Sequence, residues 1–229
     1  MLYKEIFLIF DNFIFDLDGT IINSSKEVFQ CFAMAFESVN YDIDKTRLNP
    51  DIIGPPLKEI IKLIAPELND ENKINLICQN FRQIYDNDEN DCSELYDGIL
   101  EFLKKLKKHN KKVFMATFKP MIPTIRLVNK FKLNDLFDDI YGIDKFGKHI
   151  TKEEMIEDII SKYNLNREKT VMIGDAPTDV IAAKNTGILG IGTLWGYGSD
   201  KTELKKNSNL CINNIKELDS NCEFERILK

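Results

Sequence analysis

The sequence predicts an α/β protein in which helices cover both faces of a parallel sheet, with a block of helices inserted near the N-terminus. After residue 95, short apolar runs of strand length alternate with longer runs whose apolar residues recur at helical spacing. Strands that are apolar throughout are typical of parallel sheets buried on both faces, and helices connect such strands. Between residues 23 and 91 only helical patterns occur.

Composition limits the classes of function. The chain has 229 residues, of which 43% are hydrophobic, so it can bury a sizeable core and carry an insertion. Its net charge of −6 argues against nucleic acid or an anionic membrane as a partner. Five cysteines without paired spacing argue against a disulfide framework and favour a reducing cytoplasm. Residues 1–10 are too short and too charged for a signal peptide or a membrane span.

The first strand is expected to begin the stretch Asn12–Thr20, with Ile6–Phe10 as an extension of it or a lead-in to it. Two carboxylates, Asp16 and Asp18, follow this strand, and Gly19 turns the backbone away. Residues two apart share one side of an ideal strand, although the turn can take Asp18 out of it. Two anions so close repel each other unless a cation lies between them. An oxygen-only ligand set suits Mg²⁺ better than Zn²⁺.

The inserted block is expected to hold three helices. These are Ser24–Val39, which Ser24 or Ser25 could cap, about Leu57–Ile64, and about Glu71–Tyr85. The polar run 86–91 is expected to be a solvated linker and not a metal site, because it lacks the glycine and final glutamate of an EF-hand. We therefore expect residues 23–94 to form a helical cap domain within a core made of residues 1–22 and 95–229.

After the linker, helices and strands alternate along the chain. Helices are expected at Asp97–His109, Ile122–Phe131, Lys152–Tyr163 and Thr178–Asn185, and strands at Lys112–Ala116, Asp139–Ile143, Thr170–Gly174, Gly187–Gly192 and Asn209–Ile212. Ligands of open parallel sheets bind outside the carboxyl ends of the strands. The residues that follow each strand are therefore the candidate site residues.

Polar side chains follow two of these strands. Thr117 ends one of them, and its hydroxyl, with backbone amides beside it, can donate to a phosphoryl oxygen. Asp175 ends another, and Asp179 follows in the first turn of the next helix. Taken alone, Asp179 could equally be an acidic residue favoured by the helix dipole.

These segments resemble a known family. Asp16-Leu17-Asp18-Gly19-Thr20, Thr117 and Gly174-Asp175-x-x-x-Asp179 stand in the order of the first, second and fourth motifs of the haloacid dehalogenase superfamily of phosphohydrolases. The resemblance covers nearly the whole chain and is to phosphoglycolate phosphatase-like members with a helical C1-type cap. It implies a Rossmannoid core with a parallel sheet and an inserted α-helical cap.

The resemblance also implies roles for the acidic residues. Asp16 would attack phosphorus and form an aspartyl-phosphate, while Asp18 would protonate the leaving oxygen and later activate water. Mg²⁺ would be held by Asp16, Asp175 and the backbone carbonyl of Asp18. Asp179 would orient the waters of the metal from outside. Thr117 would hold a phosphoryl oxygen.

The third motif is a lysine that neutralises the nucleophile and the phosphate. The segment 147–156 resembles it and assigns Lys152, with Lys148 as the alternative. A lysine at a helix N-terminus opposes the macrodipole, so a purely structural role is disfavoured there.

Substrate contacts are expected from Thr117, Phe118 and Lys119, and from the Gly54 and Pro55 loop of the cap. The family usually has a small or polar residue where Phe118 stands, so the pocket wall is altered. The Phe118 ring could form an aromatic surface in the pocket, or it could point into the core. The Gly-Pro-Pro run of the cap resembles a substrate-facing loop, with a plain interhelical turn as the alternative.

A further segment, 195–199, resembles the same subgroup and predicts a tight loop near the site. Its two aromatic residues, Trp195 and Tyr197, are expected to be packing residues.

The expected function is a Mg²⁺-dependent phosphomonoesterase acting on a small phosphorylated metabolite, as a monomer or else a dimer. Phosphoglycolate is slightly favoured over nucleoside 5′-monophosphates. The alternatives are a β-phosphoglucomutase-type phosphomutase, a metal-free dehalogenase, a phosphonate hydrolase and an inactive binding module. The carboxylates of Asp18, Asp175 and Asp179 argue against the dehalogenase, and no local pattern supports a cap lysine for the phosphonate hydrolase.

Overall fold

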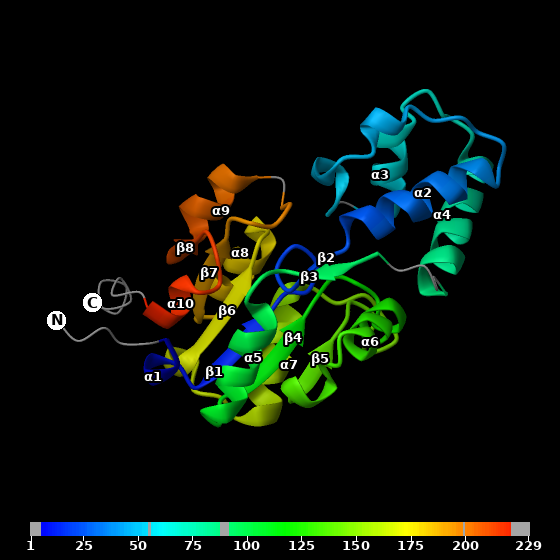
Figure 1. Ribbon diagram of the computed structural model, residues 1–229. Coiled ribbons are helices and arrows are strands. Elements are labelled where there is room, and N and C mark those ends of the chain that lie inside the picture. Colours follow the sequence, from blue (N-terminus) through cyan, green and yellow to red (C-terminus); the bar gives the residue numbers. More distant parts are fainter. Residues whose placement is uncertain (1–5, 55, 88–91, 199, 221–229) are drawn as a thin grey trace. The chain divides into compact units, whose positions relative to one another are not determined.

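The computed structural model describes residues 6–54, 56–87, 92–198 and 200–220 (Figure 1). It divides into two compact units. The core unit comprises Met1–Ile22, Leu95–Gly196 and Asp200–Lys229, and the helical unit comprises Asn23–Glu94 and Tyr197–Ser199. Within the described residues, no helix is long and apolar enough to cross a membrane.

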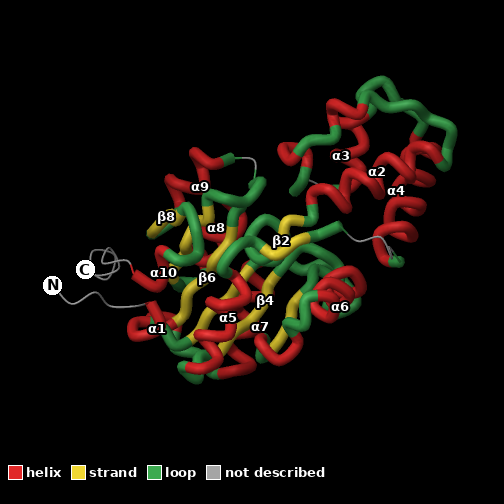
Figure 2. The backbone as a smooth tube through the Cα atoms, in the orientation of Figure 1, coloured by secondary structure: helices red, strands yellow, loops and turns green. Residues whose placement is uncertain are grey.

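The core unit is built on a six-stranded parallel sheet, drawn in yellow in Figure 2, with strand order β5-β4-β1-β6-β7-β8. The strands are β1 (Asn12–Phe15), β4 (Lys112–Ala116), β5 (Asp139–Tyr141), β6 (Thr170–Gly174), β7 (Leu189–Thr193) and β8 (Leu210–Ile212). After β1, the chain adds β4 and β5 on one side of it and then β6, β7 and β8 on the other. The carboxyl end of β1 therefore lies where the strand order reverses, which is where ligands of such sheets bind.

Helices cover both faces of the sheet. They are α1 (Ile6–Ile9), α5 (Ile99–Lys108), α6 (Met121–Lys130), α7 (Lys152–Tyr163), α8 (Pro177–Asn185), α9 (Lys201–Asn207) and α10 (Glu217–Ser220). The residues of β1 alternate between two apolar clusters. Phe13 and Phe15 pack with α5, while Ile14 packs with Met155 of α7. This alternation follows from the pleat of a strand and explains why β1 has no polar face.

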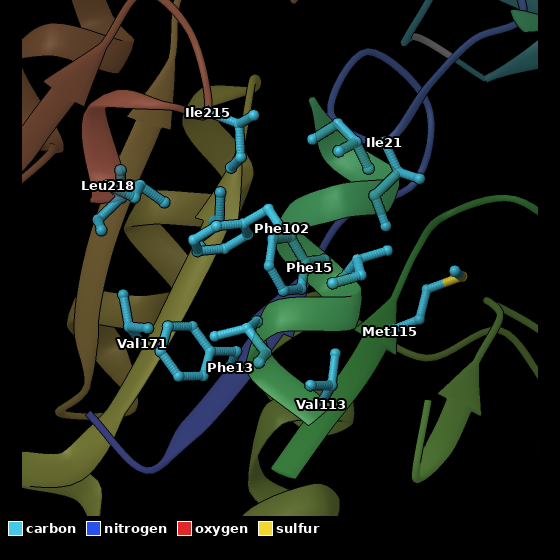
Figure 3. Close-up of a cluster of buried hydrophobic side chains, with 14 of the residues drawn as sticks. Phe13, Phe15, Ile21, Phe102, Val113, Met115, Val171, Ile215 and Leu218 are labelled. Atoms are coloured by element: carbon cyan, nitrogen blue, oxygen red, sulfur yellow. The ribbon is translucent and has the colours of Figure 1, made fainter. Parts of the chain in front are cut away.

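The larger cluster is centred on aromatic rings (Figure 3). Phe102 of α5 meets Phe13 and Phe15 edge-to-face, with ring centroids 6.4 Å apart in both pairs. Such edge-to-face pairs add to the free energy gained by burial alone. They fix β1, and so the residues that follow it, against the helix layer.

The helical unit consists of α2 (Ser25–Glu37), α3 (Leu57–Ile64), α4 (Glu71–Asp86) and two short 3₁₀ turns, Lys45–Arg47 and Pro50–Ile52. Its own apolar cluster includes Phe32 and Phe81, whose ring centroids are 4.3 Å apart. Neither predicted serine caps α2 through its side chain. Asn23 does so instead, because its Oδ1 accepts from the Ser25 backbone N–H at 3.1 Å and from the Ser25 hydroxyl at 2.6 Å.

The structure confirms the predicted fold class, and most predicted elements begin and end within a few residues of those observed. The predicted extension of the first strand was wrong, because Ile6–Ile9 forms the short helix α1, which leads into that strand. A four-residue apolar run is too short for its periodicity to separate strand from helix.

The two-residue strands β2 (Ile22–Asn23) and β3 (Glu94–Leu95), which pair with each other, were not predicted. Most of the predicted linker 86–91 lies outside the described residues.

The aromatic cluster gives a stability prediction. We expect Phe102→Ala to lower the free energy of unfolding by about 3–5 kcal/mol, because it removes a buried ring and leaves a cavity. Phe146, which is 51% exposed, is the matched control, and Phe146→Ala is expected to change stability by less than about 1 kcal/mol. Urea denaturation of both variants measures the difference. Equal losses would show that the cluster does not stabilise β1 as described.

Candidate active site

Three aspartates converge at the carboxyl edge of the sheet. Asp16 follows β1, Asp175 follows β6, and Asp179 lies in the first turn of α8. One carboxylate oxygen from each lies within 4.8 Å of the others, and all three residues are buried. Because β1 and β6 are parallel neighbours, their ends reach the same edge. The Asp16 backbone N–H donates to the Ile173 carbonyl at 2.9 Å, which extends the pairing to the first aspartate.

A buried lysine lies among these carboxylates. Nζ of Lys152 donates to Asp16 Oδ1 and to the Ala116 carbonyl, each at 2.7 Å, and lies 2.9 Å from Asp179 Oδ1. Lys152 is the first residue of α7, whose start is fixed by the Thr151 capping box. The structure therefore brings Lys152 to the aspartates. The alternative, Lys148, is 70% exposed and its Nζ lies 4.0 Å from Glu154.

The charges in this cluster do not balance. Burial alone would lower the pKa of Lys152, but the neighbouring Asp16 and Asp179 outweigh it and raise that pKa, so the lysine stays charged. Burial raises the pKa of Asp16 to about 8, helped by the Asp179 and Asp175 carboxylates and opposed by Lys152. One ammonium thus faces three carboxylates. A divalent cation with oxygen ligands fits this excess of negative charge.

Two glycines shape the space around Asp175. A Cβ atom on Gly19 would lie 2.1 Å from Asp175 Oδ2, and a Cβ atom on Gly196 would lie 2.4 Å from the same oxygen. Both approaches are far shorter than any ordinary contact, so only glycine fits at either position. The Thr20 hydroxyl donates to Asp175 Oδ1 at 3.3 Å. The sequence predicted a turn at Gly19 and Thr20 and a tight loop near the site at 195–199, but not the contact of either segment with Asp175.

Asp179 caps a helix and also faces the buried lysine. Its Oδ2 accepts from the Ala176 backbone N–H at 3.1 Å and so caps the start of α8, while its Oδ1 faces Lys152. Gly174 makes room for it, because a Cβ atom there would lie 2.2 Å from Asp179 Oδ2. The helix cap therefore positions the carboxylate in the cluster.

An ion pair joins the segment after β4 to the segment after β1. Thr117 is buried, and its Oγ1 accepts from the Lys119 backbone N–H at 3.2 Å. Nζ of Lys119 lies 3.0 Å from Asp18 Oδ1 and 3.0 Å from Asp18 Oδ2. The Asp18 carboxylate thus pairs with Lys119 and is not one of the three carboxylates that lie within 4.8 Å of one another.

Phe118 does not enter the core. Its side chain is 40% exposed, and Nζ of Lys152 lies 4.9 Å from its ring centroid, within cation–π range. It borders a largely apolar pocket of about 390 Å³ that Lys152 and Thr178 also line. Of the two expectations for this residue, the aromatic surface is the one observed.

The two residues predicted to contact substrate from the cap, Gly54 and Pro55, belong to the helical unit. Gly54 is exposed in the helical unit, and Pro55 lies outside the described residues. In the segment 195–199, Trp195 packs on the core cluster and donates from Nε1 to the Thr20 carbonyl at 3.1 Å. The Tyr197 hydroxyl is hydrogen-bonded to the Ser24 hydroxyl at 2.9 Å within the helical unit.

Comparison with known proteins gives the family. Residues 13–192 match the haloacid dehalogenase-like hydrolase family, and this chain therefore belongs to it. A 5′-nucleotidase from Pseudomonas aeruginosa is 27% identical over 86% of this chain and 88% of its own length. A pyrophosphatase PpaX from Listeria monocytogenes is 30% identical over 80% of this chain and 82% of its own length. The crystal structure of a predicted phosphatase from Clostridium acetobutylicum has a TM-score of 0.77 at 30% identity, covering 92% of this chain and 97% of that one.

These matches confirm three predictions made from the motifs. The chain has the predicted superfamily, the predicted fold and the predicted kind of enzyme, a phosphatase of the haloacid dehalogenase superfamily. The buried aspartates that could hold a metal ion lie within the matched region.

The close fit of Gly19 on Asp175 can be tested. We expect Gly19→Ala to lower phosphatase kcat/KM by about 10²-fold or more, because the new methyl group would overlap the Asp175 carboxylate and displace it from its place beside Asp16. The control is Gly147→Ala. Gly147 has a similar backbone φ of +71° against +78° for Gly19, but nothing lies within 4 Å of its Cβ position.

Both variants carry the strain of a left-handed residue, so both are expected to lose about 1–2 kcal/mol of unfolding free energy in urea. Only Gly19→Ala is expected to lose activity at Mg²⁺ concentrations that saturate the unmodified protein. Similar activity in the two variants would contradict the proposed fit.

Proposed function

We propose that this chain is a Mg²⁺-dependent phosphomonoester hydrolase that forms an aspartyl-phosphate on Asp16. The observation that carries the proposal is the contact of Asp16 with the buried Lys152 inside a cluster of three carboxylates. Asp16, Asp175 and the backbone carbonyl of Asp18 would hold the ion, and Asp179 would orient its waters. When bound, Mg²⁺ neutralises the carboxylates and polarises the phosphoryl group.

In the first step an oxygen of Asp16 bonds to phosphorus and the ester P–O bond breaks. Lys152 donates to Asp16 Oδ1 at 2.7 Å, which orients the nucleophile. Lys152 and the Thr117 hydroxyl then donate to the phosphoryl oxygens as charge spreads over them. Asp18 gives its proton to the leaving oxygen.

In the second step water attacks the phosphorus of the aspartyl-phosphate. Asp18 takes a proton from this water, the new P–O bond forms, and the bond to Asp16 breaks to release phosphate. The same residue therefore acts as acid and then as base. The 20% exposure of its side chain suits this exchange, because the carboxylate must reach both substrate and water.

The helical unit is proposed to be a cap that contributes to substrate choice. Two observations support the proposal: the unit comprises Asn23–Glu94 together with Tyr197–Ser199, and its apolar cluster is separate from those of the core. Phosphoglycolate is the substrate that the motif resemblance favours. The exposed ring of Phe118 supports a second candidate, a nucleoside 5′-monophosphate, because a half-exposed aromatic surface beside the cluster can stack on a base.

The covalent step predicts the effect of one substitution. Asp16→Asn keeps the shape of the side chain but removes the anion, so we expect hydrolysis of p-nitrophenyl phosphate to fall by about 10³-fold or more. Asp97→Asn is the control, because the Asp97 side chain is 90% exposed and pairs with Lys216. Phosphate release and the mass of the acid-quenched phosphoenzyme are measured. Substantial activity in Asp16→Asn, with no trapped intermediate in the unmodified enzyme, would contradict the mechanism.

Metal binding and pH are linked through Asp16. An ordinary carboxyl group has a pKa of about 3.9, whereas the pKa of Asp16 in the folded, metal-free protein is about 8. Between these two pH values the folded protein keeps a proton on Asp16 that the unfolded chain has lost. The stability of the metal-free protein should therefore decrease as pH rises through this window. Because Mg²⁺ replaces that proton, the increase in Tm on adding Mg²⁺ should be larger at pH 8 than at pH 6.

The Asp175→Ala variant is expected to lose most of this Mg²⁺ response at both pH values. Asp97→Ala is expected to keep it, because Asp97 lies on the surface. Differential scanning fluorimetry with and without Mg²⁺ measures the shifts. An Asp175→Ala variant with an unchanged response would show that the metal is held elsewhere.

A further inference from the structure

We infer that Lys119 selects substrates whose leaving group carries an anion close to the scissile oxygen. The inference rests on the proposed function, because it takes Asp18 as the residue that protonates that oxygen. The role inferred for Lys119 is to distinguish among phosphate esters and anhydrides. The three-aspartate cluster would act on the phosphoryl group that all of these substrates share.

Lys119 is held in place and is not a solvated surface lysine. Its side chain is 4% exposed, although long charged side chains are rarely buried unless they are paired. Its backbone N–H donates to Thr117 Oγ1 at 3.2 Å, and its carbonyl accepts from the Ile143 backbone N–H at 3.3 Å. A Cβ atom on Gly142 would lie 2.8 Å from that carbonyl, so the backbone is closely packed on this side.

The ammonium of Lys119 lies one contact beyond the proposed acid. Nζ is 3.0 Å from each oxygen of Asp18, and one of those oxygens must come within hydrogen-bond distance of the leaving oxygen. Two successive hydrogen bonds place Nζ within roughly 6 Å of the leaving oxygen. An anionic group two or three bonds away from that oxygen can therefore reach Lys119.

This geometry divides the candidate substrates by charge. In phosphoglycolate the leaving oxygen is separated from a carboxylate by one methylene group, and in pyrophosphate it belongs to a second phosphate. Both anions would share the ammonium with Asp18. In a nucleoside 5′-monophosphate or a simple sugar phosphate the leaving oxygen joins a neutral sugar, which gives Lys119 no anion to bind. A buried ammonium attracts an anion more strongly than a solvated one.

Lys119 could instead do no more than hold Asp18 in place, and the two roles make different predictions. A residue that only positions the acid assists every substrate with a poor leaving group, charged or neutral. A residue that also binds the leaving group assists the anionic substrates further. Comparison of a charged and a neutral leaving group of similar basicity separates these roles.

The test uses three substrates and the full chain with Mg²⁺. Phosphoglycolate has an anionic, poor leaving group, glycerol 3-phosphate a neutral, poor one, and p-nitrophenyl phosphate a neutral, good one. For the unmodified enzyme we expect kcat/KM for phosphoglycolate to exceed that for glycerol 3-phosphate at least tenfold. Lys119→Met is expected to reduce this ratio at least tenfold, whatever its effect on p-nitrophenyl phosphate hydrolysis. Lys119→Arg should keep part of the preference.

Lys148→Met is the control, because Lys148 is exposed and lies outside the site. If Lys119→Met lowers kcat/KM equally for phosphoglycolate and glycerol 3-phosphate, Lys119 only positions Asp18 and the inference is wrong. An unmodified enzyme without preference for the anionic leaving group would also overturn it, whether or not the variant folds. Failure of the proposed function gives a different result, namely p-nitrophenyl phosphate hydrolysis that survives in Asp16→Asn.

Discussion

The contact of the Lys152 ammonium with Asp16 and Asp179 is the interaction on which the geometry of the site depends. It joins the start of α7 to the end of β1, the first turn of α8 and, through the Ala116 carbonyl, the end of β4. All of these groups are buried, so the lysine cannot be removed without leaving several carboxylates without compensation. The site is therefore both a functional centre and a junction of four elements.

The sheet and the glycines place the remaining carboxylate. Asp175 reaches the cluster because β6 pairs in register with β1, so that both strands end at one edge. Its exact place follows from two backbone segments, at Gly19 and Gly196, that leave no room for a side chain. Burial and repulsion among three carboxylates both oppose this arrangement, and the pKa of Asp16 is raised by burial first and by the neighbouring carboxylates second. Packing from the aromatic cluster under β1 supplies stability that offsets it.

Local pattern predicted much of this structure, but not the contacts that cross the chain. The strand ends could be read from apolar runs, and the edge of a parallel sheet then brings Asp16 and Asp175 together. The pairing of Lys119 with Asp18 could not be predicted, because the two residues are 101 positions apart and neither has a local signal for the other. The helix at Ile6–Ile9 was missed for a different reason. Its apolar residues could pack into the core from a strand or from a helix, and tertiary packing decides which of the two forms.

Two aspartates only two residues apart are given different surroundings by two lysines. Asp16 ends a strand and is held by Lys152 in a buried cluster that already contains two other carboxylates. Asp18 lies past the strand, and its side chain is 20% exposed and faces Lys119. A nucleophile must remain an oriented anion, whereas an acid that is also a base must exchange protons with substrate and water. The turn after Leu17 separates these requirements, because it directs the two carboxylates to different cations and to different degrees of contact with solvent.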